Sequence, residues 1–294
     1  MNYAAHEAYI APAKGAPQIW RFILGLILAL IIYVLGFLAL LGLVALTNGG
    51  LAGLQSWMLR MQTADAPTAT LLILGTFWGM AAGAMLTAKL VHRRPIASLF
   101  GPRALVQRHF LIATLAAAGV FAVSVLIPIG ISPEKNLGVA LWASFMPLAI
   151  VGVFVQTGAE EILFRGYIQQ QLAARFSNPV IWMVLPSALF ALGHLDPATY
   201  GSNAWLIVAA TGLFGVLAAD LTAKTGSIGA AWGLHFANNV LAILLISLEG
   251  PLSGLALYTL PIGADSADIL RPLIFMDMGI TLIAWAAVRY AVTR

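Results

Sequence analysis

The chain has 294 residues, of which 61% are hydrophobic and only 9% are charged. A soluble globular domain carries roughly a quarter charged residues, so a chain with this composition and a mean hydropathy of +0.93 lacks the polar surface to fold in water. These values exclude a soluble enzyme, a disordered scaffold and a nucleic-acid-binding protein, although the formal charge is +4. Cysteine is absent, which excludes disulfides, thiolate metal sites and a cysteine nucleophile.

Apolar segments long enough to cross a bilayer recur along the chain. A membrane-spanning helix needs about 20 mainly apolar residues, and the sequence offers about eight such segments. They are residues 20–46, 69–91, 110–131, 137–165, 179–195, 204–222, 228–248 and 269–291. The sequence therefore predicts an all-α fold, a polytopic membrane helix bundle of about eight transmembrane helices, that forms a single integral membrane domain over residues 1–294.

The basic residues are distributed unequally between the two sides of this predicted bundle. One side holds Lys14, Arg21, Lys89, Arg93, Arg94, Arg103, Arg108, Arg175, Lys224, Arg289 and Arg294, and the other holds Arg60, Lys135 and Arg271. Cytoplasmic loops of membrane proteins carry the excess of Lys and Arg. The sequence thus predicts a multi-pass protein of the cell inner or plasma membrane with both termini in the cytosol. The lipid bilayer, rather than a nucleic acid, is the partner that explains the basic excess.

Ionisable residues inside the predicted helices need a partner or a purpose, because burying a charge in hydrocarbon is costly. Glu161 and Arg165 are four residues apart with the acid first, which is the favourable order for an ion pair within one helix. Glu160 points about 100° away from Glu161 on a helix. It has no cation nearby on its own helix and shares a face with Phe164.

Two further helices carry polar residues at the spacing of one helical face. His194 follows Phe190 by four residues, and Asn239 follows His235 by four. The turn sequence at residues 176–179 predicts a hairpin that brings His194 to nearly the same depth as Glu160. Two imidazoles, a carboxylate and an amide from three helices are therefore predicted to converge in the cytosolic half of the bilayer. A lone histidine in a membrane helix is also explained by a hydrogen bond between helices, without any catalytic role.

Other polar residues of the helices have simpler interpretations. Asp220 and Lys224 are four residues apart and predict a structural ion pair near the inner face. The hairpin tip, with three glutamines at residues 169–171 and Arg175, is expected to project past the membrane as an amphipathic segment. Asp277 lies inside the last span, and the sequence assigns no partner to it.

The three polar motifs resemble those of a known family. Residues 160–165 (EEILFR) are similar to the EExxxR motif of the CAAX prenyl protease and bacteriocin-processing (CPBP) intramembrane proteases. Residues 190–194 (FALGH) look like the FxxxH motif of that family, and residues 235–239 (HFANN) resemble its HxxxN motif. The three motifs occur in the family's order, so residues 140–245 are expected to form a catalytic core that resembles the CPBP/CAAX protease domain.

The resemblance implies a function and a role for each matched residue. Glu160 would be the general base, His194 would help it activate a water, and His235 with Asn239 would stabilise the oxyanion. The supporting positions would be Glu161, Arg165, Phe164 and Phe190. The chain would then be an intramembrane endopeptidase that hydrolyses a peptide bond near the cytosolic membrane face, and its substrate a membrane-associated peptide or protein that could carry a lipid.

Two alternatives stay open beside this hypothesis. Zinc could be held by Glu160, His194 and His235, and the family has often been described as metalloproteases. The chain has no HExxH pair on one helix, and asparagine is a poor zinc ligand, so the sequence favours a glutamate-based site with no required cofactor. A non-catalytic membrane protein is the second alternative: a transporter, or an immunity or chaperone-like partner in bacteriocin systems, whose polar cavity binds without cutting.

Overall fold

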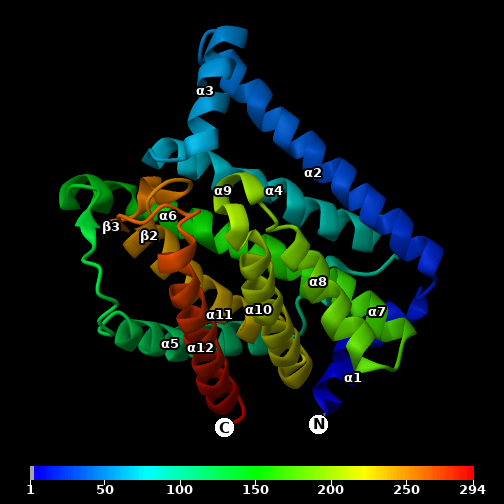
Figure 1. Ribbon diagram of the computed structural model, residues 1–294. Helices are drawn as coiled ribbons and strands as arrows, with labels where there is room; N and C mark the ends of the chain where they lie inside the picture. Colours follow the sequence, from blue (N-terminus) through cyan, green and yellow to red (C-terminus); the bar gives the residue numbers. More distant parts are fainter. Residues whose placement is uncertain (1–2) are drawn as a thin grey trace.

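The computed structural model describes residues 3–294 as a bundle of helices, with the two ends of the chain at the same end of the bundle (Figure 1). The α-helices are α1 (Ala4–Ile10), α2 (Ile19–Thr47), α3 (Leu51–Thr63), α4 (Pro67–Leu90), α5 (Arg103–Ser124), α6 (Val139–Glu161), α7 (Gln170–Arg175), α8 (Leu185–Leu192), α9 (Pro197–Tyr200), α10 (Ala204–Thr225), α11 (Gly229–Asn239) and α12 (Ala267–Val292). Helix α3 lies at the end of the bundle opposite the termini (Figure 1). The predicted all-α class is confirmed.

Shorter helical turns connect or extend these helices. The π-helical segments are η3 (Ile162–Gln169), η4 (Val180–Val184) and η6 (Val240–Leu245). The 3-10 turns are η1 (Ala11–Gly15), η2 (Ile96–Leu99), η5 (Gly201–Asn203) and η7 (Ser253–Leu255). Three short strands, β1 (Glu134–Lys135), β2 (Ile246–Leu248) and β3 (Tyr258–Leu260), form a small sheet in the order β1-β3-β2, with β1 antiparallel and β2 parallel to β3.

Six helices within residues 3–294 are long and apolar enough to cross a membrane: Ile19–Thr47, Pro67–Leu90, Ile96–Ser124, Val139–Arg175, Pro197–Thr225 and Ala267–Val292. Two apolar helices, Val180–Leu192 and Gly229–Leu245, are shorter. All eight predicted segments therefore coincide with helices, and the apolar surface of the bundle is that of a polytopic membrane protein. These two shorter helices carry the FxxxH and HxxxN motifs.

Three predicted segments extend beyond the helices that they contain, among them 179–195, whose helix ends at Leu192. The segment 110–131 corresponds to α5, which begins earlier at Arg103 and ends at Ser124. The apolar composition continues past that end, but Pro128 and Gly130 do not favour a helix there. The segment 228–248 ends as a helix at Leu245, where residues 246–248 become β2. A strand of three residues has too little sequence for an alternating pattern, so it could not be predicted.

Glycines allow α11 to pack closely against its neighbours. A Cβ at Gly229 or Gly233 would lie 2.4 Å from the carbonyl oxygen of Val106 or Phe110 on α5. A Cβ at Gly158 of α6 would lie 2.5 Å from the ring of Trp232 on α11. Only glycine permits such approaches of backbone to its neighbours. They hold the first half of α11 against α5 and beside the end of α6.

The prediction of an exposed amphipathic segment at the hairpin tip is wrong for its three glutamines, although Arg175 and residues 177–179 are exposed. Gln169, Gln170 and Gln171 are buried, because the N-terminal segment and the loop before η2 fold over them. Gln170 Nε2 donates to the carbonyl oxygens of Tyr9 at 2.8 Å and of Ser98 at 2.9 Å. The Gln170 side-chain oxygen accepts a hydrogen bond from Arg94, and Gln171 Nε2 donates to the Ala16 carbonyl oxygen at 3.2 Å. The glutamines attach the tip to the rest of the protein.

The predicted pairing of Asp220 with Lys224 is also wrong. Asp220 Oδ2 accepts hydrogen bonds from Arg289 Nε at 2.9 Å and from Trp285 Nε1 at 3.0 Å, both on α12. Tyr3, which precedes α1, donates its hydroxyl to Asp220 Oδ1 at 2.8 Å. Tertiary packing of α10 against α12 provides a nearer cation than the same helix does. Asp277 lies on the exposed side of α12, and none of the described side chains forms a hydrogen bond or ion pair with it.

Candidate active site

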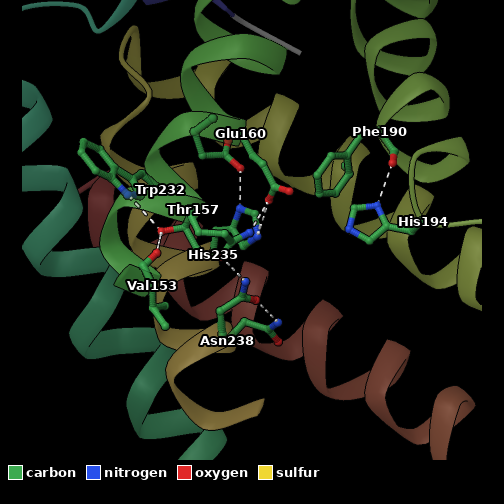
Figure 2. A network of polar contacts seen from close by, with 12 residues as sticks. Val153, Thr157, Glu160, Phe190, His194, Trp232, His235 and Asn238 are labelled. Atoms are coloured by element: carbon green, nitrogen blue, oxygen red, sulfur yellow. Dashed lines mark hydrogen bonds and ion pairs between the residues drawn. The ribbon is translucent and has the colours of Figure 1, made fainter. Parts of the chain in front are cut away.

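The polar motifs meet where α6 passes into η3 beside α11 (Figure 2). Glu160 and Glu161 are the last residues of α6, and Arg165 follows in η3. His235 and Asn239 lie one turn apart on α11. The EExxxR and HxxxN motifs thus share one cluster, although Glu161 and His235 are 74 residues apart in sequence.

Glu161 is the most completely buried member of the cluster, with no exposed surface. Its Oε1 accepts hydrogen bonds from Arg165 Nη1 at 3.0 Å and from His235 Nδ1 at 2.8 Å. The predicted ion pair between Glu161 and Arg165 is therefore present. Arg165 also donates to the Gly215 carbonyl oxygen at 3.3 Å, and its guanidinium lies over the Phe190 ring at 4.9 Å. Glu161 and Arg165 thus join α6, η3, α10 and α11.

Glu160 is 5% exposed, and its Oε2 lies between two partners. Gln156 Nε2 donates to it at 2.7 Å, and His235 Nε2 lies 3.4 Å away. The two ring nitrogens of His235 therefore face the two neighbouring glutamates. A carboxylate can only accept, so filling both contacts takes a proton on each ring nitrogen or a proton on Glu160.

Asn239 joins the cluster through Gln156. Its Nδ2 donates to Gln156 Oε1 at 2.8 Å, and its Oδ1 accepts from Asn238 Nδ2 at 3.1 Å. The sequence reasoning did not single out Gln156, although an amide four residues before Glu160 in an apolar helix was a visible signal. That spacing places Gln156 on the same face of α6 as Glu160.

His194 stands apart from these contacts. Helix α8 ends at Leu192, so His194 occupies the following turn and is exposed. Its Nδ1 lies 2.8 Å from the Phe190 carbonyl oxygen, and its ring is 4.7 Å from the Phe190 ring (Figure 2). Since a carbonyl oxygen only accepts, Nδ1 carries a proton, and Nε2 has no hydrogen-bond partner among the described residues. Within residues 3–294, His194 has no hydrogen bond or ion pair with Glu160 or His235.

Aromatic rings occupy the space between His194 and His235. The Phe190 ring centroid is 6.0 Å from that of His235 and 5.1 Å from that of Phe164, and Phe214 lies 4.8 Å from His235. Phe164 and Phe190, the predicted supporting aromatics, thus contact each other beside the cluster. Phe190 and Phe214 place apolar surface against the imidazole of His235, which strengthens electrostatic interactions there.

The structure does not gather Glu160, His194 and His235 into one group of three candidate ligands. No group of three or more His, Cys, Asp or Glu side chains that could hold a metal ion occurs among residues 3–294. His194 forms no hydrogen bond or ion pair with Glu160 or His235 among these residues, and the two His235 nitrogens face Glu160 and Glu161. The cluster as built presents a carboxylate, imidazole nitrogens and amide donors to a reactant.

Comparison with known proteins shows a similarity over the part of the chain that holds this cluster. Residues 140–241 match the family model described as type II CAAX prenyl endopeptidase Rce1-like. A curated relative, the uncharacterized protein YyaK of Bacillus subtilis (strain 168), is 24% identical over 260 residues, which cover 84% of this chain and 85% of that protein. No solved structure gives a significant match. Residues 140–241, which hold all three motifs, are thus similar to the Rce1-like type II CAAX prenyl endopeptidases.

Proposed function

We propose that this protein is an intramembrane endopeptidase in which Glu160 activates a water for attack on a peptide bond near the cytosolic membrane face. The match of residues 140–241 to the Rce1-like family model supports an intramembrane peptidase. The observation that carries the proposal is the state of Glu160. Its Oε2 is held by Gln156 and faces His235, while no donor among residues 3–294 forms a hydrogen bond with its Oε1. That free oxygen, in a nearly buried carboxylate, is available to a water molecule.

The chemistry requires one proton acceptor and one means of stabilising negative charge. Glu160 takes a proton from the water as the oxygen of the water attacks the carbonyl carbon, and later gives that proton to the leaving amine. His194, held by Phe190 through Nδ1, has Nε2 free to accept the second hydrogen bond of the same water. Glu160 and His194 form no hydrogen bond with each other, yet both must act on the attacking water. That water, or the bound substrate, therefore has to lie between the two side chains.

The oxyanion of the tetrahedral intermediate needs preorganised donors. Asn239 uses one N–H of its Nδ2 on Gln156, and a primary amide has a second. That second N–H is the donor that we assign to the oxyanion. His235, between Glu160 and Glu161, supplies the neighbouring positive charge when its ring is doubly protonated.

A cleavage assay in detergent tests the assignment of Glu160. The probes are two versions of one fluorogenic peptide with a C-terminal CAAX sequence, one prenylated and one without lipid. We expect the native chain to cleave the prenylated version, while Glu160→Gln and His194→Ala abolish cleavage and leave the protein folded. Near-native cleavage by Glu160→Gln would show that another group is the base. Cleavage of the unlipidated peptide at the same rate would show that the lipid is not recognised.

The cellular substrate can be sought without a chosen peptide. Membrane proteomes of cells with the native chain and with Glu160→Gln should differ by an uncut membrane-associated protein that accumulates in the variant. A proton-coupled uptake activity that depends on Glu160, in a protein that cuts neither peptide, would instead support a transporter.

We further propose that the reaction requires no metal. Zinc ligands must be deprotonated and assembled, and metal bound in this way is released by chelators. We expect purified protein to cleave its substrate after chelator treatment and to contain no stoichiometric zinc by elemental analysis. Stoichiometric zinc that is lost in His235→Ala, with loss of cleavage in chelator, would overturn the metal-free mechanism.

We also propose that both termini lie in the cytosol, which would place the end of η3 and α7 at the cytosolic face. The unequal distribution of Lys and Arg supports this orientation. A reporter enzyme that works only outside the cytosol should give no signal when fused to Arg294. A strong signal would reverse the orientation and place the reaction at the opposite face.

A further inference from the structure

Gln156 links the proposed base to the proposed oxyanion donor. The residue lies on α6 one turn before Glu160 and is 6% exposed. Its Nε2 donates to Glu160 Oε2 at 2.7 Å, and its Oε1 accepts from Asn239 Nδ2 at 2.8 Å. These two partners determine the orientation of the amide, because a carboxylate accepts only and the NH₂ group of Asn239 donates only.

The orientation of Asn239 depends on Gln156 in turn. Asn238 Nδ2 donates to Asn239 Oδ1 on one side, and Gln156 Oε1 accepts a hydrogen bond from Asn239 Nδ2 on the other. Without Gln156, the terminal amide of Asn239 can rotate, since the energy of such sp³–sp² torsions is broad and roughly two-fold. A rotated amide would present its oxygen, rather than an N–H, to the developing negative charge.

We infer that Gln156 is a positioning residue of the reaction, which fixes the carboxylate of Glu160 and the amide of Asn239 in one arrangement before substrate arrives. This inference rests on the proposed function. Gln156 acts through its two partners, because both polar groups of its side chain are occupied by them. In a buried site such hydrogen bonds, one of them to a charged group, hold their partners more firmly than they would in water.

The first test replaces Gln156 with a side chain of similar length that has no amide. We expect Gln156→Met to lower kcat roughly ten- to a hundredfold, as the loss of a hydrogen bond to a charged group does, with little change in KM. The matched control is Gln169→Met. Gln169 is a fully buried glutamine whose Nε2 donates to the Ala219 carbonyl oxygen at 3.1 Å, outside the Gln156 contacts. The control should keep the native kcat in protein that remains folded.

A double-mutant cycle separates positioning from a general structural role. If Gln156 acts by orienting Asn239, Gln156→Met should reduce kcat much less in an Asn239→Ala background than in the native chain. If Gln156 only supports the fold, the two losses should multiply. The same cycle in melting temperature needs no substrate, and it should show a coupling between the two residues in the same direction.

The outcomes distinguish this inference from the proposed function. Loss of cleavage in Glu160→Gln with native kcat in Gln156→Met would overturn the role of Gln156 and leave the mechanism intact. Independent effects of Gln156 and Asn239 in both cycles would overturn it too. Near-native cleavage by Glu160→Gln would overturn the proposed mechanism itself, while the melting-temperature cycle would still decide whether Gln156 holds Asn239.

Discussion

Two acidic clusters inside the helices differ in how completely their charges are paired. The paired-glutamate cluster consists of Glu160, Glu161, Arg165 and His235, so two carboxylates share one guanidinium and one imidazole. One of its oxygens, Glu161 Oε2, is buried without a hydrogen-bond partner among residues 3–294. The cluster holds more negative charge than permanent positive charge, and a proton has to make up the difference.

The Asp220 cluster is closed by comparison. It consists of Tyr3, Asp220, Trp285 and Arg289, so a single carboxylate meets one guanidinium and two further donors. Both oxygens of Asp220 are occupied, and the charges cancel. Burying a charge is costly unless the charge is paired. A carboxylate with incomplete pairing in an apolar setting therefore indicates a catalytic role, whereas a completely paired carboxylate indicates a structural role. We therefore assign the reaction to the first cluster and a structural role to the second.

The largest expected difference comes from removing the cation of each cluster. Arg165→Met leaves Glu161 buried with only His235 as partner, and uncompensated buried charges of this kind cost about 3–5 kcal/mol of stability. Arg289→Met should cost less, about 1–3 kcal/mol, because Tyr3 and Trp285 still donate to Asp220 and the Arg289 side chain is 32% exposed. Thermal unfolding in detergent measures both. Equal losses would contradict the contrast between the two clusters.

The second contrast removes one uncharged donor from each cluster. Asn239→Ala should lower turnover roughly a hundred- to a thousandfold and leave KM nearly unchanged, because the lost donor acts mainly in the transition state. Asn239→Asp should be at least as damaging, since it adds a negative charge beside the oxyanion. Trp285→Phe removes a donor from Asp220 and should reduce stability by about 1 kcal/mol while turnover stays native. Steady-state kinetics beside unfolding curves separates the two variants, and a Trp285→Phe protein with reduced turnover would contradict the structural role of its cluster.

The paired-glutamate cluster could largely be predicted from sequence because its contacts follow helical spacing. Glu161 with Arg165 is a pair within one helix, and His235 with Asn239 marks one face of another. The motifs thus indicated which faces meet, and the structure brings Glu160, His235 and Asn239 together. The spacing did not reveal that one imidazole would face both glutamates, because that depends on how α11 packs against α6.

The Asp220 cluster and the hairpin tip could not be predicted from local spacing. Asp220 has Lys224 one turn away, yet Arg289 pairs with it from a helix 69 residues further along the chain. The three glutamines at the tip have the composition of an exposed segment, but the N-terminal segment covers them. Both errors arise because segments distant in sequence provide the partners. His194 was predicted to join the cluster from its spacing on one helix. That helix ends two residues before His194, so its imidazole lies outside the cluster.

The smallest expected effect concerns pH and the N-terminal segment that closes the Asp220 cluster. His6 on α1 is 3% exposed and lies 4.4 Å from the Trp182 ring, and burial lowers its pKa from 6.5 to about 4. Burial also lowers the pKa of His92 to about 4. Between pH 6.5 and about pH 4 the unfolded chain binds protons on these histidines that the folded chain does not. The free energy of unfolding is therefore unaffected above the unfolded pKa and falls as the pH decreases through this range.

His6→Phe tests this dependence, because phenylalanine keeps the contact with Trp182 and cannot be protonated. Between about pH 7.5 and about pH 5.5 the native chain should lose about 1 kcal/mol more stability than His6→Phe does, and His92 should supply a slope common to both. Unfolding curves at the two pH values measure the difference, and parallel losses would show that His6 is not buried as a neutral ring.

Because Tyr3 beside α1 contacts Asp220, protonation of His6 should act on the Asp220 cluster. Turnover per folded molecule should then respond to pH alike in the native chain and in His6→Phe. If the two profiles differ, the N-terminal segment is coupled to the paired glutamates, and the separation between the two clusters does not hold.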